Sequence, residues 1–225
     1  MPSIQSHQNR LEALVAASPV IPVVSVAGAE QAVALAGALH ESGLRTVEIT
    51  LRTPGALEGI AAVRQALPDV TVGAGTVLDA AQMRAASEAG CRFSVSPGVT
   101  DAVLAASLEF DLPLLPGAAT PGETQALLER GVRLQKFFPA EPCGGLAYLN
   151  ALAGPYPQVR FCPTGGINAD NAPQYLAASN VACVGGSWMA PASAVNSGDW
   201  DTVRDRSARA ARMAASSGSS PAGAG

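Results

Sequence analysis

The chain has 225 residues, of which 48% are hydrophobic and only 14% are charged. This length suits one large domain, because α/β barrels reach it without splitting. The apolar content excludes a disordered chain, which lacks enough apolar surface to offset the entropy lost on ordering. The net charge of −4 excludes a general affinity for nucleic acid, which needs clustered Lys and Arg.

The first fifteen residues, MPSIQSHQNRLEALV, lack the basic start and continuous apolar run of a secretory signal peptide. We therefore expect a cytoplasmic protein with no membrane partner. Reduced, structural thiols are expected at the widely spaced cysteines, which are Cys91, Cys143, Cys162 and Cys183. The only histidines, His7 and His40, are isolated, so neither a metal site nor a cofactor is expected.

Eight short β-rich runs alternate with Ala-rich helical stretches, a pattern typical of a parallel sheet covered by helices. In chain order the runs are VIPVVSV from Val20, TVEIT from Thr46, VTVGAG from Val70, FSVS from Phe93, PLLPG from Pro113, RLQKFFP from Arg133, VRFCPTG from Val159 and VACVGG from Val181. Eight units predict an α/β fold of the (β/α)8 TIM barrel type, with an extra N-terminal helix over about residues 5–17 that closes its bottom.

An open doubly wound sheet is the alternative architecture, but it usually has five or six strands. The segment from Gly73 to Leu78 (GAGTVL) matches only the first half of the dinucleotide-binding fingerprint G-x-G-x-x-G. The strand count therefore favours the barrel.

Caps and glycines predict where several helices begin and end. Helix starts are expected at Thr53-Pro54, Asp79, Thr100-Asp101 and Thr120-Pro121, and helix ends at Gly43, Gly90 and Gly131. The last residues, AASSGSSPAGAG, contain little that can be buried. We predict one barrel domain over residues 1–213, including the N-terminal helix, and a disordered tail over residues 214–225.

Lys136 is the only lysine of the chain. In a strand, alternation groups Lys136 with Leu134 and Phe138 on one face, and Gln135 with Phe137 on the other. If the Lys136 face points into the barrel, desolvation favours the neutral amine, which is a nucleophile toward carbonyl groups. The alternative is an interior lysine with a purely structural role.

The second β-rich run places a carboxylate inside the same barrel. Alternation turns Val47 and Ile49 toward the helices and Glu48 and Thr50 inward. Strands two and six are both even-numbered and lie opposite each other, so Glu48 can face Lys136 in one interior layer. General acid/base chemistry is the predicted role of Glu48, and an ion pair that serves packing alone is the alternative.

Anion-binding groups are expected on the rim of the barrel. Arg52, just past the second strand, is predicted to pair with a substrate carboxylate, or else is a solvated charge. Glycine loops follow the seventh and eighth runs, where such barrels commonly bind phosphate; they contain Thr164, Gly165 and Gly166, and Gly185, Gly186 and Ser187. A helix beginning near Ser187 is expected to aim its positive end at the same anion, with tight turns alone as the alternative.

Taken together, these motifs resemble the 2-keto-3-deoxy-6-phosphogluconate (KDPG) aldolase family, which includes 4-hydroxy-2-oxoglutarate (KHG) aldolase activity. The resemblance covers roughly residues 10–212. Its carriers are VEITLRTPGAL from Val47, VGAGTVLD from Val72, FSVSPG from Phe93, LPGAATPGE from Leu115, KFFPAE from Lys136, RFCPTGGI from Arg160 and GGSWMAP from Gly185.

The resemblance implies a class I aldolase that cleaves phosphorylated KDPG to pyruvate and glyceraldehyde 3-phosphate, as in the Entner-Doudoroff pathway of carbohydrate metabolism. It implies a Schiff base at Lys136 and proton transfer by Glu48. It further implies carboxylate contacts from Arg52 and Thr76, pocket walls at Pro97 and Phe138, and a phosphate site at Thr164, Gly165, Gly166, Gly185, Gly186 and Ser187. A metal-independent homotrimer is also implied.

Three alternatives remain open from the sequence. The same lysine chemistry can act on 4-hydroxy-2-oxoglutarate, which yields glyoxylate and pyruvate, or on the C4-epimeric phosphogalactonate. A non-catalytic barrel that binds a phosphosugar is the second alternative. A metal-dependent aldolase is the third, and the two isolated histidines speak against it.

Overall fold

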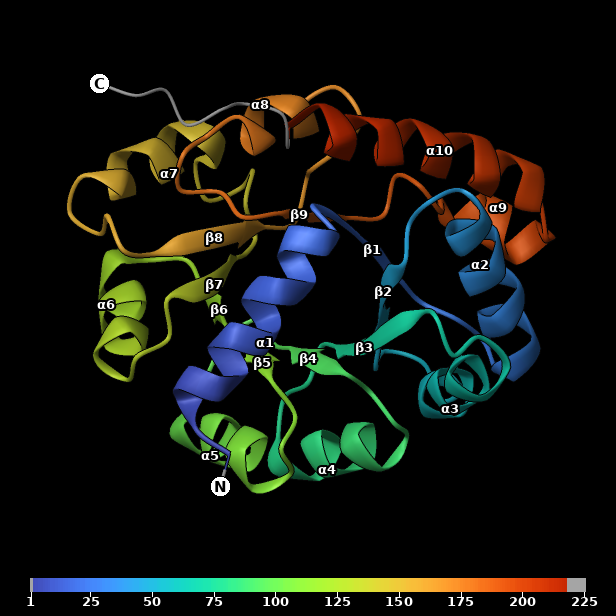
Figure 1. The fold of residues 1–225 in the computed structure, drawn as a ribbon, viewed down its shortest axis with the longest axis horizontal. Coiled ribbons are helices and arrows are strands. Elements are labelled where there is room, and N and C mark those ends of the chain that lie inside the picture. Colours follow the sequence, from blue (N-terminus) through green and yellow to red (C-terminus); the bar gives the residue numbers. More distant parts are fainter. Residues whose placement is uncertain (1, 218–225) are drawn as a thin grey trace.

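The computed structural model describes residues 2–217 and shows an α/β fold with strongly curved, parallel sheets (Figure 1). The strands are β1 (Val20–Val24), β2 (Thr46–Thr50), β3 (Thr71–Gly75), β4 (Phe93–Val95), β5 (Leu114–Leu115), β6 (Gly117–Ala118), β7 (Leu134–Phe137), β8 (Arg160–Pro163) and β9 (Val184–Gly186). The helices are α1 (Ile4–Ala17), α2 (Ala29–Glu41), α3 (Ala56–Ala66), α4 (Ala80–Glu88), α5 (Asp101–Glu109), α6 (Pro121–Glu129), α7 (Gly145–Ala153), α8 (Ala172–Leu176), α9 (Ala192–Ser197) and α10 (Trp200–Ser217).

One sheet has the strand order β5-β4-β3-β2-β1-β9, and a smaller sheet has the order β6-β7-β8. We predicted one strand in the β-rich run from Pro113, and this prediction is wrong. The run is divided into β5 and β6 at Pro116, because proline has no N–H to donate to a sheet. Isolated parallel bridges pair Phe161 with Val181 and Thr164 with Gly185, and so connect β8 to the chain around β9.

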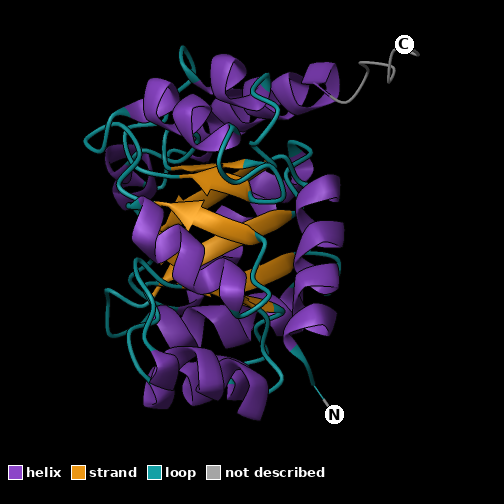
Figure 2. Ribbon diagram, turned by 90° about the vertical axis from the view of Figure 1, so that its left-hand side faces the viewer, coloured by secondary structure: helices purple, strands orange, loops and turns teal. Residues whose placement is uncertain are grey.

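The side chains of the strands divide between two hydrophobic clusters. An outer cluster, which contains Val47, Ile49 and Phe137, lies between the strands and the surrounding helices, and Figure 2 shows these helices enclosing the strands. An interior cluster consists of Leu11, Val15, Ile21, Phe93, Val95, Leu115, Leu134, Cys162 and Cys183. The expected alternation of β2 is confirmed, since the side chains of Val47 and Ile49 both belong to the outer cluster.

The N-terminal helix predicted over about residues 5–17 is confirmed as α1. Its residues Leu11 and Val15 belong to the interior cluster, and α1 packs against β5 and β7. In Figure 1, α1 lies across the centre of the view, over the strands. The helix therefore covers one end of the space that the strands surround, as expected from its position before the first strand.

Most of the expected helix boundaries are confirmed. Asp79, Thr100 and Thr120 each accept a hydrogen bond from the third residue of the following helix, and Thr120 forms a capping box with Glu123. Glycines with positive φ end three helices as expected, at Gly43 (94°), Gly90 (87°) and Gly131 (83°). The start expected at Thr53-Pro54 is wrong: α3 begins at Ala56, because the hydroxyl of Thr53 donates to the Val26 carbonyl at 2.6 Å instead of capping the helix.

The final helix, α10, extends to Ser217, four residues past the expected end of the domain at residue 213. The rest of the expected tail, residues 218–225, lies outside the described residues. None of the helices in the described part of the chain is long and apolar enough to cross a membrane.

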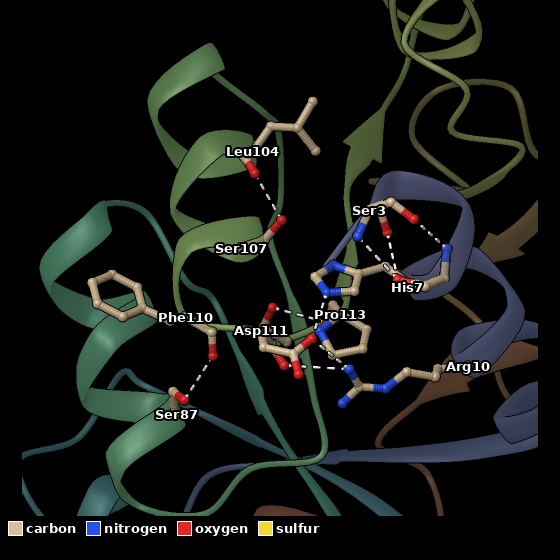
Figure 3. Close-up of polar contacts among 11 residues, drawn as sticks. Ser3, His7, Arg10, Ser87, Leu104, Ser107, Phe110, Asp111 and Pro113 are labelled. Atoms are coloured by element: carbon tan, nitrogen blue, oxygen red, sulfur yellow. Dashed lines mark hydrogen bonds and ion pairs between the residues drawn. The ribbon is translucent and has the colours of Figure 1, made fainter. Parts of the chain in front are cut away.

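Polar contacts fix α1 against the rest of the fold (Figure 3). His7 Nε2 lies 3.1 Å from Asp111 Oδ1, and Arg10 Nη1 donates to the same oxygen at 2.8 Å. The hydrogen bond from His7, together with the charge of Arg10, lowers the pKa of the Asp111 carboxyl. The buried Gln8 side chain accepts hydrogen bonds at 2.8 Å from the N–H groups of Arg133 and Leu134, where β7 begins.

Replacing Gln8 with leucine is expected to destabilise the protein by about 2 kcal/mol, because two backbone N–H groups at the start of β7 lose their acceptor. Gln5→Leu on the same helix is the matched control, since Gln5 is exposed and bonds only Asn9; its effect is expected to stay within about 0.5 kcal/mol. Urea denaturation measures both variants, and equal midpoints would refute the role assigned to Gln8.

Candidate active site

The structure brings Lys136 and Glu48 together, although they lie 88 residues apart in the sequence. Lys136 on β7 and Glu48 on β2 form an ion pair in which Nζ lies 3.6 Å from Oε1. Their side chains are only 7% and 5% exposed. The Lys136 ammonium also lies 5.1 Å from the centre of the Phe138 ring. An amine and a carboxylate therefore share one largely water-excluded space, as the alternation of the two strands predicted.

Glycine on the neighbouring strand makes room for the carboxylate. Gly75 pairs with Thr50 in the β2–β3 register, and a Cβ atom at Gly75 would lie 2.2 Å from Glu48 Oε1. Any larger side chain would displace the carboxylate from Lys136. The last glycine of the VGAG pattern therefore leaves the space that the Glu48 carboxylate occupies. This role was not predicted from the sequence.

The interior cluster closes the space around Lys136 on the side toward α1. Cys162 is the register partner of Lys136 in the β7–β8 pair, and Cys162 and Cys183 both belong to that cluster. Interaction between the two buried thiols lowers the pKa of Cys162 and raises that of Cys183. All four cysteines of the chain are free thiols, which confirms the expectation from their spacing.

Arg52 follows β2 and is held by a short chain of hydroxyl groups. Its Nε donates to Thr50 Oγ1 at 3.1 Å, and that hydroxyl lies 2.7 Å from Ser25 Oγ. Arg52 and Ser187 line one cavity of about 360 Å³ at the end of β1. The two residues expected to bind a carboxylate and a phosphate thus lie at the same cavity. No role was predicted for Ser25 or Thr50, although alternation already placed Thr50 on the face of Glu48.

Thr76 directly follows β3 and Pro97 lies two residues after β4, so both are at the carboxyl ends of these strands. Thr76 has a φ of +61°, a conformation that a β-branched residue rarely adopts, and such strain is typical of functional loops. The Pro97 carbonyl packs against Gly117, where a Cβ atom would lie 2.1 Å from its oxygen. Because all the paired strands are parallel, these residues lie at the same edge of the sheets as Arg52 and Phe138.

The two glycine loops also lie side by side at this edge. Thr164 forms an isolated bridge with Gly185, and a Cβ atom at Gly185 would lie 2.5 Å from Thr164 Oγ1. Gly165 and Gly166 have φ values of +99° and +84°, which favour glycine. The structure therefore brings together the loops that the sequence singled out for phosphate.

The helix expected near Ser187 is wrong. Residues 187–190 form a turn in which Ala190 donates to the Ser187 carbonyl, and α9 begins only at Ala192. Pro191 explains the difference, because it has no N–H to donate to Ser187 as the first helical turn would require. The backbone of the glycine loops, rather than the end of a helix, therefore lies at the position predicted for the phosphate.

Among residues 2–217, no group of three or more His, Cys, Asp or Glu side chains is placed to hold a metal ion.

Comparison with known proteins agrees with this geometry. Residues 11–205 match the family model described as KDPG and KHG aldolase. The chain belongs to this family. It is 44% identical over 200 residues to the KHG/KDPG aldolase of Escherichia coli, covering 89% of this chain and 94% of that protein. It is 46% identical over 200 residues to the 2-dehydro-3-deoxy-phosphogluconate aldolase of Dickeya dadantii, with the same coverage.

A solved family member has a closely similar structure. The KDPG aldolase of Legionella pneumophila superposes with a TM-score of 0.85 at 43% identity, covering 88% of this chain and 96% of that one. Its crystals hold pyruvate as a covalent carbinolamine intermediate captured at low pH. The match confirms the family resemblance that the sequence motifs carried.

The Glu48 carboxylate has no hydrogen-bond or ion-pair partner other than Lys136 within the described residues. Lys136→Met is therefore expected to destabilise the protein by about 3 kcal/mol, because it leaves a buried carboxylate unpaired. The double variant Lys136→Met/Glu48→Met is expected to regain most of that loss. Urea denaturation of both single variants and the double variant measures the coupling, and additive losses would contradict a direct interaction.

Proposed function

We propose that the protein is a class I aldolase that cleaves 2-dehydro-3-deoxy-6-phosphogluconate to pyruvate and glyceraldehyde 3-phosphate. The observation that carries this proposal is the enclosed pair of Lys136 Nζ and Glu48 Oε1 at 3.6 Å. Membership of the KDPG and KHG aldolase family supports it, as does the covalent carbinolamine of pyruvate in the Legionella relative.

The reaction begins when the neutral amine of Lys136 attacks the C2 ketone of the substrate and forms a carbinolamine. Glu48, which took the proton of the Lys136 ammonium, gives it to the carbinolamine hydroxyl, so that water leaves and a protonated imine forms between Lys136 and C2. The imine withdraws electrons from the adjacent carbon, and this prepares the C3–C4 bond for cleavage.

Glu48 then removes the proton of the C4 hydroxyl, directly or through a water molecule. The C4–O electrons form the aldehyde, the C3–C4 bond breaks, and its electrons move to the imine to give an enamine on Lys136. Glyceraldehyde 3-phosphate leaves. Glu48 returns its proton to C3, and water hydrolyses the imine to release pyruvate and restore the free amine.

The residues at the carboxyl-end edge are proposed to bind the two ends of this substrate. Arg52 and Thr76 bind the carboxylate of the pyruvate half, and Pro97 and Phe138 form walls beside the reacting carbons. The phosphate is held by the two glycine loops, at Thr164, Gly165, Gly166, Gly185, Gly186 and Ser187. This arrangement is supported by the position of all these residues at the carboxyl ends of parallel strands.

A second candidate is the same chemistry on 4-hydroxy-2-oxoglutarate or on the C4-epimeric phosphogalactonate. The name of the Escherichia coli relative, which covers both KHG and KDPG, favours the first of these. Steady-state kinetics on matched substrates discriminates between the candidates. A phosphate site that contributes to the transition state requires a large loss of kcat/KM without the phosphate, and equal values would favour the unphosphorylated substrate.

We also propose that the two sheets close into one (β/α)8 barrel within a single domain over residues 1–213. The bridges between β8 and the chain around β9 support closure, and only Pro116 separates β5 from β6. Residues 214–225 are proposed to be dispensable, and full activity of a chain ending at residue 213 would agree with this. A cytoplasmic location is supported by the free thiol state of the cysteines.

A homotrimer is proposed from the family resemblance. Among the described residues, Leu78 is the large apolar side chain most exposed to solvent, at 56%. It lines a shallow cavity together with Val99 and Val103. This surface suits contact with a second copy of the chain. Light scattering should give the mass of three chains, and the mass of one chain would contradict the proposal.

Incubation with pyruvate and sodium borohydride tests the mechanism, because the chain has a single lysine. We expect a reduced pyruvyl adduct on Lys136 by peptide mass spectrometry. Lys136→Arg should form no adduct there. Glu48→Gln should still form the adduct but lose activity by about 10²- to 10⁴-fold, since only proton transfer is removed.

Circular dichroism serves as the control that each variant is folded. A folded wild-type protein without an adduct on Lys136 would overturn the Schiff-base mechanism and favour the binding-protein or metal-dependent alternative.

A further inference from the structure

The three carbonyl groups of Thr164, Gly165 and Gly166 are all held by donors from outside this loop. The Ala140 N–H donates to the Thr164 carbonyl at 2.8 Å, and the Glu141 N–H donates to the Gly165 carbonyl at 3.0 Å. The third carbonyl, of Gly166, accepts a hydrogen bond at 3.1 Å from the side-chain amide of Asn171.

The amide groups that follow the second and third of these carbonyls have no internal partner. Within residues 2–217, neither the N–H of Gly166 nor that of Ile167 donates a hydrogen bond. Consecutive positive φ values at Gly165 and Gly166 turn the chain at this point. A loop whose carbonyls are bonded on one side and whose amides remain free is suited to hold an anion.

Asn171 is the only side chain among these three donors, and its own position is unusual. It occupies the N-cap of α8, where asparagine normally accepts a hydrogen bond from the helix, but it makes no such cap. Its Oδ1 instead accepts from the Asn168 N–H at 2.8 Å, while its Nδ2 donates to Gly166. Asn168 Oδ1 in turn accepts from the Asn171 N–H at 3.1 Å.

We propose that Asn171 is a positioning residue that orients the Gly166 and Ile167 amides toward the phosphate and so makes the site select phosphorylated substrates. This proposal rests on the proposed function, because it assigns the phosphate of the substrate to the loop. Asn171 acts through the Gly166 carbonyl and does not itself contact the reacting atoms. Its loss should therefore affect phosphate binding and leave the chemistry at Lys136 intact.

The test compares Asn171→Ala with Asn150→Ala, a matched control at an exposed position on α7. Each is assayed on phosphorylated KDPG and on unphosphorylated 4-hydroxy-2-oxoglutarate. For Asn171→Ala we expect kcat/KM to fall about 10- to 100-fold on the phosphorylated substrate, mainly through KM, as expected when hydrogen bonds to a charged group are lost. The value for the unphosphorylated substrate should stay within about twofold, and Asn150→Ala should change neither.

Calorimetric titration with inorganic phosphate provides a readout that does not depend on catalysis. The Kd for inorganic phosphate should rise in Asn171→Ala by a similar factor, and the pyruvyl adduct on Lys136 should form as in the wild type. An equal loss on both substrates, or an unchanged Kd for phosphate, would overturn the role of Asn171.

Failure of the proposed function gives a different result. In that case the wild-type protein itself forms no adduct and cleaves neither substrate, whereas the effect of Asn171→Ala on the Kd for inorganic phosphate is still measurable.

Discussion

The ion pair between Lys136 and Glu48 is the interaction on which the rest of the site depends. Each charged group is nearly without contact to solvent, so loss of either one leaves the other buried and unpaired, which destabilises the fold. The surroundings are built to allow the pair: Gly75 leaves space for the carboxylate, and the interior cluster with Cys162 closes the space below the amine. The proposed nucleophile and the proposed proton acceptor are thereby held at one point.

From this pair the proposed substrate sites extend along one edge of the sheets. The register of β7 with β8 places Lys136 beside the strand that leads into Thr164 and the first glycine loop. The turn after β7 also bonds directly to that loop through Ala140 and Glu141. The position of the amine and the position of the proposed phosphate loop are therefore coupled through the backbone. This coupling fixes the distance between them.

Local patterns predicted those parts of the fold that depend on short-range chemistry. Alternation was sufficient to turn Glu48 and Lys136 inward, and the caps at Asp79 and Thr120 mark true helix starts. The failures involve competing partners. Thr53 bonds to the distant Val26 carbonyl, and Pro191 prevents the helix that was expected near Ser187, a restriction that was visible in the sequence but not used.

By itself, the sequence determined the α/β class, the family and the identity of the amine and the carboxylate, because strand periodicity and family motifs are properties of neighbouring residues. Only the tertiary structure decided how these residues meet: the 3.6 Å contact across the interior, the shared cavity of Arg52 and Ser187, and the hydrogen bond from Asn171 to Gly166. These contacts join strands and loops that are distant in the chain, and their geometry depends on packing that no local pattern encodes.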